Sequence, residues 1–261
     1  PGQLTELPID IDPRLPGLWV WEEPNPDCYY VLGVDISDGV GETESIVSVV
    51  KYPGYEQVAE WFSSRSSVEE TAYVARYLAE RYGGGNCMVI PETNRNGNLI
   101  LYLLFHLPGN YSVFRWRYLD RPAQETNDNP KLGWETNTNT KKALVQVANL
   151  VFLRGQGRVR SAVLHEQMTR CIDVLPGVRW RAAGGRSDRV IAYLIALIGA
   201  YLDYEGGSVG NIVSERRQHL PSQEIPGWRE PATFDAGVDE VYSGRVPPVG
   251  SAFWKTDMED R

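Results

Sequence analysis

Apolar and polar positions alternate in blocks along the middle of the chain, and the blocks predict strands followed by helices. The run over residues 29–35 is apolar and rich in β-branched and aromatic residues, which predicts a buried strand that ends at Asp35. Two more strands are expected over residues 45–52 and 56–62, with a Pro-Gly turn between them. Three consecutive strands with short connections indicate an antiparallel meander.

A helix and another buried strand are expected next. Ser66 or Ser67 begins a capping-box pattern, and apolar residues then recur at helical spacing until the glycine run at residues 83–85. The short apolar run over residues 87–90 predicts a strand that is buried on both faces, and it leads to Glu92. A lone carboxylate therefore ends an apolar strand for the second time.

The rest of the central region predicts helices joined by polar segments. Helices are expected over residues 97–106, from Thr138 or Thr140 to Leu153, and over residues 165–174 and 188–204, with extended segments at 111–118 and 158–164, a long loop at 119–139 and a basic loop or hairpin at 178–185. The last helix is apolar on nearly all sides, which is typical of a helix at the centre of a domain.

Composition divides the chain of 261 residues into three parts. Residues 1–27 are rich in proline and acid and predict a linker or N-terminal arm, residues 28–204 predict the folded domain, and residues 205–261 show no lasting period and predict a loosely ordered C-terminal tail. The three cysteines are far apart, which fits neither a disulfide framework nor a zinc site and favours a reducing cytosol. The longest apolar run is too short to span a bilayer, so no membrane partner is expected.

The net charge of −8 argues at first against a nucleic-acid partner, but its distribution changes that picture. Residues 28–204 hold 19 Lys and Arg against 18 Asp and Glu, whereas both flanking segments are acidic. If some central carboxylates bind metal, the remaining central surface is mildly basic.

Three carboxylates stand where an apolar element meets a loop: Asp35, Glu92 and Asp188. If they converge, they need cations, because otherwise their pKa values would rise steeply. Hard divalent ions with oxygen ligands meet that need, and two such ions support phosphodiester hydrolysis. For Asp35 a loop-capping role is an equal alternative, and for Asp188 the first turn of a helix is favourable by itself.

The order of these elements resembles that of RNase H-like nucleases, and four local motifs resemble the nuclease domain of the large terminase subunit of tailed bacteriophages. The motifs are GVDISDGVG around Asp35, IPETNRNG around Glu92, GWETNTNTK at residues 133–141 and SDRVIAYLIALIGAY from Ser187. The third is the most specific. Together they cover roughly residues 28–204.

The resemblance implies an RNase H-like α/β fold, with a mixed sheet of five or more strands flanked by helices. It also implies a metal-dependent endonuclease that cleaves double-stranded DNA during viral genome packaging in the host cytoplasm. Asp35, Glu92 and Asp188 would be the catalytic residues and would hold two Mg²⁺ or Mn²⁺ ions. The implied partners are DNA, an ATPase motor domain, the portal protein and the small terminase subunit. No Gly-x-x-x-x-Gly-Lys phosphate loop is present, so we expect this chain to be an excised nuclease domain.

Two departures from the family pattern concern further acidic residues. The family often has two adjacent acidic residues before the last helix, whereas Ser187 precedes Asp188 here. The family also often has an Asp after the first glycine-rich loop, where this chain offers Glu42 and Glu44. Either glutamate could be an accessory ligand or a solvated turn residue.

Contacts to DNA are expected from residues near the third and fourth motifs, namely Trp134, Asn137, Lys141, Arg179 and Arg186. For the basic residues in this set, a solvated surface is an equal alternative.

Two other functions are consistent with parts of the sequence. An actin-like ATPase has a similar first strand and glycine-rich hairpin, but it would need a second such hairpin and a longer chain. A non-catalytic docking module could keep the RNase H-like shape. Metal titration separates the three, because only the nuclease should bind divalent ions tightly without nucleotide.

Overall fold

The computed structural model describes residues 15–37, 43–83, 85–94, 97–115, 132–175, 179–182 and 187–204. The chain divides into two units, residues 1–218 and 219–261, and every described residue belongs to the first. Several expectations fall outside the described residues: most of the long loop, the tail at 205–261, Glu42 and Arg186.

A mixed sheet of six strands forms the middle layer of the described part. Its strands are β1 (Leu18–Val20), β2 (Tyr29–Asp35), β3 (Ser45–Tyr52), β4 (Glu56–Ser63), β5 (Cys87–Pro91) and β6 (Ser112–Val113), in the order β1-β4-β3-β2-β5-β6. The predicted meander of β2, β3 and β4 is confirmed, because both of its pairs are antiparallel. β5 then pairs with β2 in parallel, and β6 with β5.

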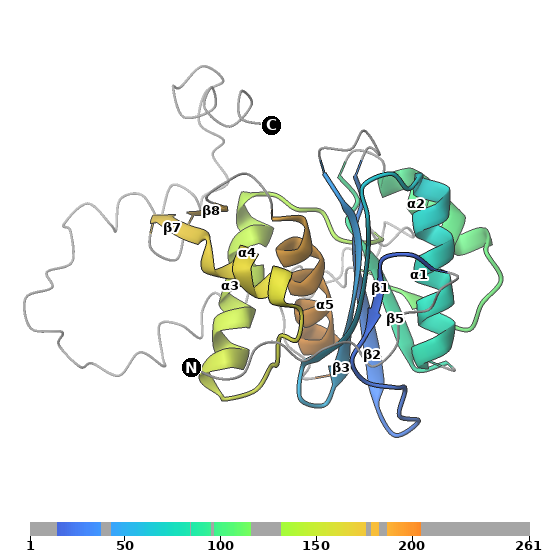
Figure 1. The fold of residues 1–261 in the computed structure, drawn as a ribbon, viewed down its shortest axis with the longest axis horizontal. Helices are drawn as coiled ribbons and strands as arrows, with labels where there is room; N and C mark the ends of the chain where they lie inside the picture. Colours follow the sequence, from blue (N-terminus) through green and yellow to red (C-terminus); the bar gives the residue numbers. More distant parts are fainter. Residues whose placement is uncertain are drawn as a thin grey trace, which may run out of the picture. The chain divides into compact units, whose positions relative to one another are not determined.

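Helices cover both faces of this sheet. They are α1 (Val68–Gly83), α2 (Gly97–His106), α3 (Thr138–Leu153), α4 (Ala162–Thr169) and α5 (Asp188–Tyr204). Figure 1 shows α1 and α2 on one face and α3, α4 and α5 on the other. The expected helices at 97–106 and 188–204 are confirmed with the same bounds.

Local side-chain bonds explain where two of these helices begin. At α1 the Glu70 N–H donates to the Ser67 hydroxyl at 3.2 Å, and the Ser67 N–H donates to the Glu70 carboxylate at 2.9 Å, which completes the predicted capping box. At α3 the cap is Asn137 rather than Thr138 or Thr140, because the Asn137 side chain accepts the backbone N–H groups of residues 139 and 140.

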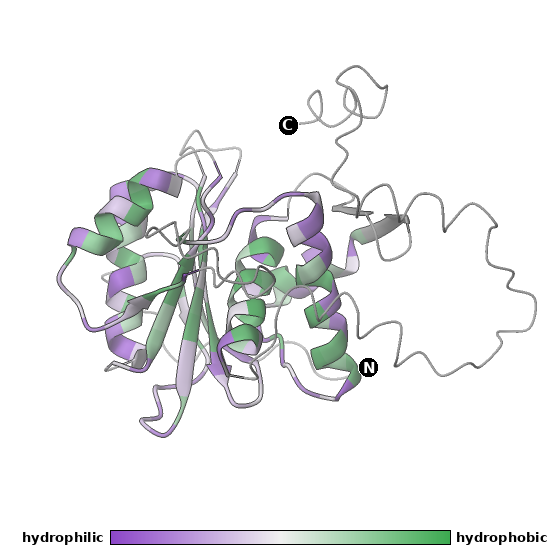
Figure 2. Ribbon diagram, turned by 180° about the vertical axis from the view of Figure 1, so that it is seen from behind, coloured by the Kyte–Doolittle hydropathy of each residue, from purple (hydrophilic) through white to green (hydrophobic). Residues whose placement is uncertain are grey.

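Alternating side chains of β2 supply two hydrophobic cores, one on each face of the sheet. Tyr30, Leu32 and Val34 pack in the core on the side of α1 and α2, whereas Val31 packs with α3, α4 and α5. Figure 2 shows hydrophobic strands in the middle and hydrophilic positions on the outer sides of the helices. The expectation of a buried α5 is confirmed, because its residues from Val190 to Ile198 are all buried.

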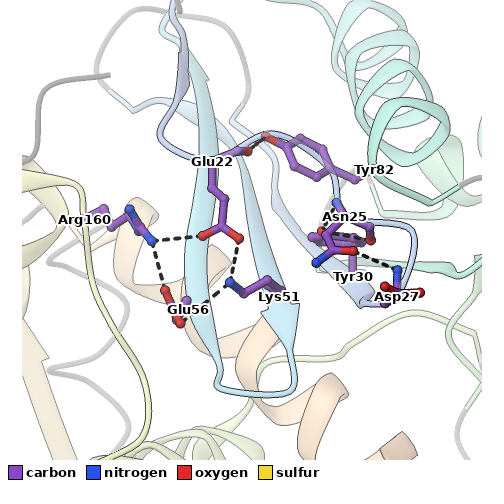
Figure 3. Close-up of polar contacts among 8 residues, drawn as sticks. All are labelled: Glu22, Asn25, Asp27, Tyr30, Lys51, Glu56, Tyr82 and Arg160. Carbon is purple, nitrogen blue, oxygen red and sulfur yellow. Dashed lines mark hydrogen bonds and ion pairs between the residues drawn. The ribbon is translucent and has the colours of Figure 1, made fainter. Parts of the chain in front are cut away.

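The expected arm at residues 1–27 needs a correction, because part of it belongs to the sheet. β1 pairs antiparallel with β4 at the sheet edge, and Leu18 and Val20 are fully buried. The segment after β1 is also fastened, as Figure 3 shows: the Tyr82 hydroxyl of α1 donates to the Glu22 carbonyl at 2.8 Å. The prolines therefore belong to the segments on either side of β1, and β1 itself forms because it pairs with β4.

The segment at residues 158–175 also differs from its prediction. No strand spans residues 158–164, since only Arg158 forms a bridge, with Glu56, and Ser161 caps α4. α4 therefore begins three residues earlier than expected and ends at Thr169, where β7 (Cys171–Leu175) soon follows. β7 pairs antiparallel with β8 (Arg179–Ala182), so the basic segment supplies one strand of a hairpin whose other strand lies in the segment expected to be helical.

Candidate metal centre

Two of the predicted carboxylates stand at the ends of neighbouring parallel strands. β2 ends at Asp35, and Glu92 directly follows β5. Val34 pairs with Pro91, so the residues that follow this pair are also neighbours. The Glu92 N–H continues the ladder by donating to the Val34 carbonyl at 2.8 Å. The register of the sheet therefore places Asp35 and Glu92 side by side.

Strand alternation turns both of these side chains toward the same face. Val31 on β2 and Ile90 on β5 lie in the core that includes α5. Asp35 follows Val31 by four positions and Glu92 follows Ile90 by two, so each shares the face of its partner. Both carboxylates therefore lie on the α5 side of the sheet.

Gly33 lets α5 lie against β2, and this contact sets the position of Asp188. A Cβ atom on Gly33 would lie 1.9 Å from the Ala192 carbonyl oxygen and 2.7 Å from the Ala196 nitrogen. Asp188 is about one helical turn before Ala192. The first turn of α5 therefore comes to the end of β2 that carries Asp35.

Asp188 is held in place by the backbone before β3. Its Oδ2 atom accepts the N–H of Glu44 at 3.1 Å. A carboxylate in the first turn also interacts favourably with the helix dipole. Structural stabilisation of α5 and a role in a metal site are both compatible with this position.

The pKa of Asp35 shows that the three carboxylates influence one another. Burial raises the pKa of the Asp35 carboxyl well above its ordinary value, and the Glu92 charge, a hydrogen bond with Glu92 and the Asp188 charge raise it further. Burial and the two neighbouring charges therefore all disfavour the charged form of Asp35. A bound cation would oppose these effects.

The donor set suits a hard divalent cation. Three carboxylates supply oxygen ligands, which Mg²⁺ and Mn²⁺ prefer. Among the described residues, however, no three His, Cys, Asp or Glu side chains already stand in a metal-binding group. A shared ion would therefore require the three carboxylates to turn toward one another.

The loop before α3 packs along the end of β5 and supports Glu92. Trp134 forms a bridge with Glu92, and its N–H donates to the Pro91 carbonyl at 2.8 Å. The Asn94 amide donates to Glu92 Oε1 at 3.3 Å and to the Thr136 carbonyl at 2.8 Å, and its oxygen accepts the Thr136 N–H at 3.2 Å. Asn94 thus joins the Glu92 carboxylate to the most specific of the sequence motifs.

The predicted DNA-contacting residues separate into three groups. Trp134 is fully buried in the core, so its predicted contact with DNA is wrong and its role is structural. Asn137 is exposed, and Lys141 is partly buried on the second turn of α3. Arg179 lies on β8, but its side chain and the whole of Arg186 are outside the described residues.

Sequence reasoning missed two residues at this site. Asn94 was part of a motif, but its bond to Glu92 depends on the loop at residues 132–137. Arg189 precedes the apolar part of α5 in the sequence, yet it is buried and forms ion pairs with Glu44 and Glu60. A charged residue next to Asp188 and directly before a long apolar run was the signal that could have identified it.

We expect the metal-free protein to lose stability relative to its Asp35→Asn variant as pH rises. The pKa of Asp35 is raised in the folded state, so the folded protein binds more protons than the unfolded chain between about pH 4 and the folded pKa. The free energy of unfolding from this group therefore falls across that window and is constant above it. Urea unfolding in a chelator at several pH values measures the difference, and a constant difference from pH 4 to 8 would contradict the expectation.

Comparison with solved structures shows what fold this site belongs to. The large terminase nuclease of the thermophilic phage G20c, solved with bound magnesium, superimposes with a TM-score of 0.56 at 18% identity, covering 75% of this chain and 92% of that one. The same nuclease with bound cobalt gives the same values. The large terminase nuclease domain of Thermus phage P74-26 gives a TM-score of 0.52 at 19% identity, covering 78% and 93%. No family model and no curated protein matches the sequence.

The described domain therefore has the RNase H-like α/β fold, and the predicted fold class is confirmed. Within that class, its fold is that of phage large terminase nuclease domains. No helix among the described residues is long and apolar enough to cross a membrane.

Proposed function

We propose that this protein is a metal-dependent endonuclease that cleaves double-stranded DNA during viral genome packaging. The observation that carries the proposal is that Asp35 and Glu92 follow paired positions of the parallel strands β2 and β5, while Asp188 lies in the first turn of α5, which packs on β2. It is supported by the fold, because the similar solved structures are terminase nucleases, of which one holds magnesium and another cobalt.

The chain's own residues would bind, orient and balance charge. The chemistry that two divalent ions would supply, when bound, is activation of a water and neutralisation of charge on the leaving oxygen. Asp35 and Glu92 would bind these ions from adjacent strands. Asp188 would approach from the first turn of α5 and complete the ligand set. The Asn94 amide would keep Glu92 turned toward the site.

The DNA backbone would approach over the N-terminal end of α3. Trp134 anchors the loop before that helix beside Glu92, so Asn137 and Lys141 follow the site directly in the chain. A phosphate there would meet the Lys141 cation and the helix dipole. Arg179 and Arg186 remain proposed phosphate contacts. These residues would contact the DNA backbone rather than the bases, so we propose that sequence preference is weak.

The packaging context of the proposal comes from the terminase resemblance. An ATPase motor domain, the portal protein and the small terminase subunit are the proposed partners, in the host cytoplasm. The balanced charge of residues 28–204 would give only weak DNA binding, so the motor domain would supply most of the affinity for DNA.

A plasmid nicking assay with Mg²⁺, Mn²⁺ or chelator tests the proposal. We expect nicking and linearisation with either metal, none with chelator, and no requirement for nucleotide. Calorimetric titration with Mn²⁺ should run beside it. A protein that binds no divalent ion would instead be the docking module, and one that binds metal only with nucleotide would favour the ATPase alternative.

A further inference from the structure

Arg189 is a buried cation next to the proposed ligand Asp188. Its side chain is only 3% exposed. One guanidinium nitrogen, Nη1, contacts the carboxylate of Glu60, which is fully buried on β4. The guanidinium also lies 4.1 Å from the ring centre of Phe62 on β4 and 5.5 Å from that of Trp19 on β1. These contacts therefore link the first turn of α5 to β4 and β1.

Glu44 connects this cation to Asp188. The Glu44 Oε2 atom accepts from Arg189 Nε at 3.3 Å and from Nη2 at 3.2 Å. The backbone N–H of the same residue donates to Asp188 Oδ2. The Glu44 side chain is thus directed to Arg189, while its main chain holds the proposed ligand.

Glu60 is fixed in turn by neutral donors. Its carboxylate accepts from the Ser161 hydroxyl at 3.1 Å and from the Gln57 amide at 3.1 Å. Burial raises the pKa of Glu60, and Arg189 opposes that shift. Because Ser161 also caps α4, the arrangement joins α4, β4, α5 and the residue before β3.

We propose that Arg189 and Glu44 are positioning residues that orient the Asp188 carboxylate for metal binding, and that Glu44 is not itself a ligand. The inference rests on the proposed function. A guanidinium suits the role because its planar fork fixes two carboxylates at once. A buried ion pair is weak evidence of a contribution to stability, so a stabilising role alone explains its presence poorly.

Paired substitutions of Glu44 test the inference through Mn²⁺ affinity, measured by calorimetry. Glu44→Ala leaves Arg189 and Glu60 paired but releases the backbone that holds Asp188, and we expect affinity to fall by about tenfold, as for other residues that orient ligands. Glu44→Gln keeps an oxygen that can accept from Arg189. We therefore expect it to retain affinity within about threefold.

A second variant removes the cation itself. Arg189→Met alone would leave the Glu60 carboxylate buried without its partner, so Glu60→Gln is combined with it. We expect the double variant to fold and to lose Mn²⁺ affinity by about tenfold.

Arg160→Met is the matched control. Arg160 Nη2 also pairs with two glutamates, Glu22 at 3.0 Å and Glu56 at 2.9 Å, as Figure 3 shows. That cluster lies at the Lys51 end of β3, about 20 Å along the strand from Ser45. Arg160→Met should change the melting temperature without changing Mn²⁺ affinity.

The outcomes distinguish the inference from the proposed function. If the wild-type protein binds no Mn²⁺, the proposed function fails and the inference fails with it. If the wild type binds but Glu44→Ala and the double variant bind equally well, only the inference is overturned. Equal losses in Glu44→Gln and Glu44→Ala would make Glu44 a ligand and also overturn it. An equal loss of Mn²⁺ affinity in Arg160→Met would show that the effect comes from lower overall stability, which would also overturn the inference.

Discussion

Asp35→Asn, Glu92→Gln and Asp188→Asn are each expected to reduce DNA cleavage on the order of a hundred- to a thousandfold. Each change would remove one negative oxygen from the proposed ligand set, in which Glu92 and Asp188 both raise the pKa of Asp35. The loss follows because the charge that stabilises the leaving oxygen depends on the bound ions. Plasmid nicking rates at saturating Mn²⁺ measure the effect.

The substitution of Asp35 should not weaken the fold. In chelator, Asp35→Asn should match or exceed the wild-type melting temperature, because it removes charge from a buried and repulsive position. Glu166→Gln is the control, since Glu166 is an exposed carboxylate paired with Arg170 on the surface of α4. It should leave both cleavage and melting temperature unchanged. Wild-type cleavage in any of the three site variants would remove that residue from the proposed ligand set.

Gly33→Ala should cause a large loss of stability. The new methyl group would meet two backbone atoms of α5, at 1.9 Å and 2.7 Å, and backbone cannot rotate away as a side chain can. Relief requires α5 to move off β2, at a cost of about 3 kcal/mol in the free energy of unfolding. Because α5 carries Asp188, the surviving folded protein should also cleave more slowly. Urea unfolding and nicking rates measure the two effects.

Gly155→Ala separates this steric effect from the conformational preference of glycine. Gly155 has a positive φ of 68°, and a Cβ atom there would meet nothing within 4 Å. The variant should lose about 1–2 kcal/mol, the cost of a left-handed conformation for alanine, and keep its cleavage rate. If Gly33→Ala lowered the free energy of unfolding no more than Gly155→Ala, the inferred steric effect of α5 packing closely on β2 would be wrong.

The sequence determined most elements of the sheet and its helices because their signals are local. Apolar runs with β-branched residues fixed β2, β3 and β5, and the capping box at Ser67 fixed the start of α1. The ends of two apolar strands also identified Asp35 and Glu92 as unusual carboxylates. In these cases, the information needed lies within a few residues of the feature.

The tertiary structure decided the features that depend on distant partners. Trp134 looked available to DNA because its sequence neighbours are polar, but pairing with the end of β5 buries it. β1 was expected to be part of an arm, because no local pattern announces an edge strand of three residues. Likewise, the start of α4 depends on Ser161, whose hydroxyl is also bound to Glu60 on β4.

The support for Asp188 is the clearest case of this division. The sequence placed Asp188 at the start of a buried helix, and local period was enough for that. The bonds that hold it come from Glu44, and those that hold Glu44 come from Arg189, across separations of 144 and 145 positions. Periodicity carries no information over such distances, whereas packing of α5 on the meander brings these charges together in a buried setting where each must find a partner.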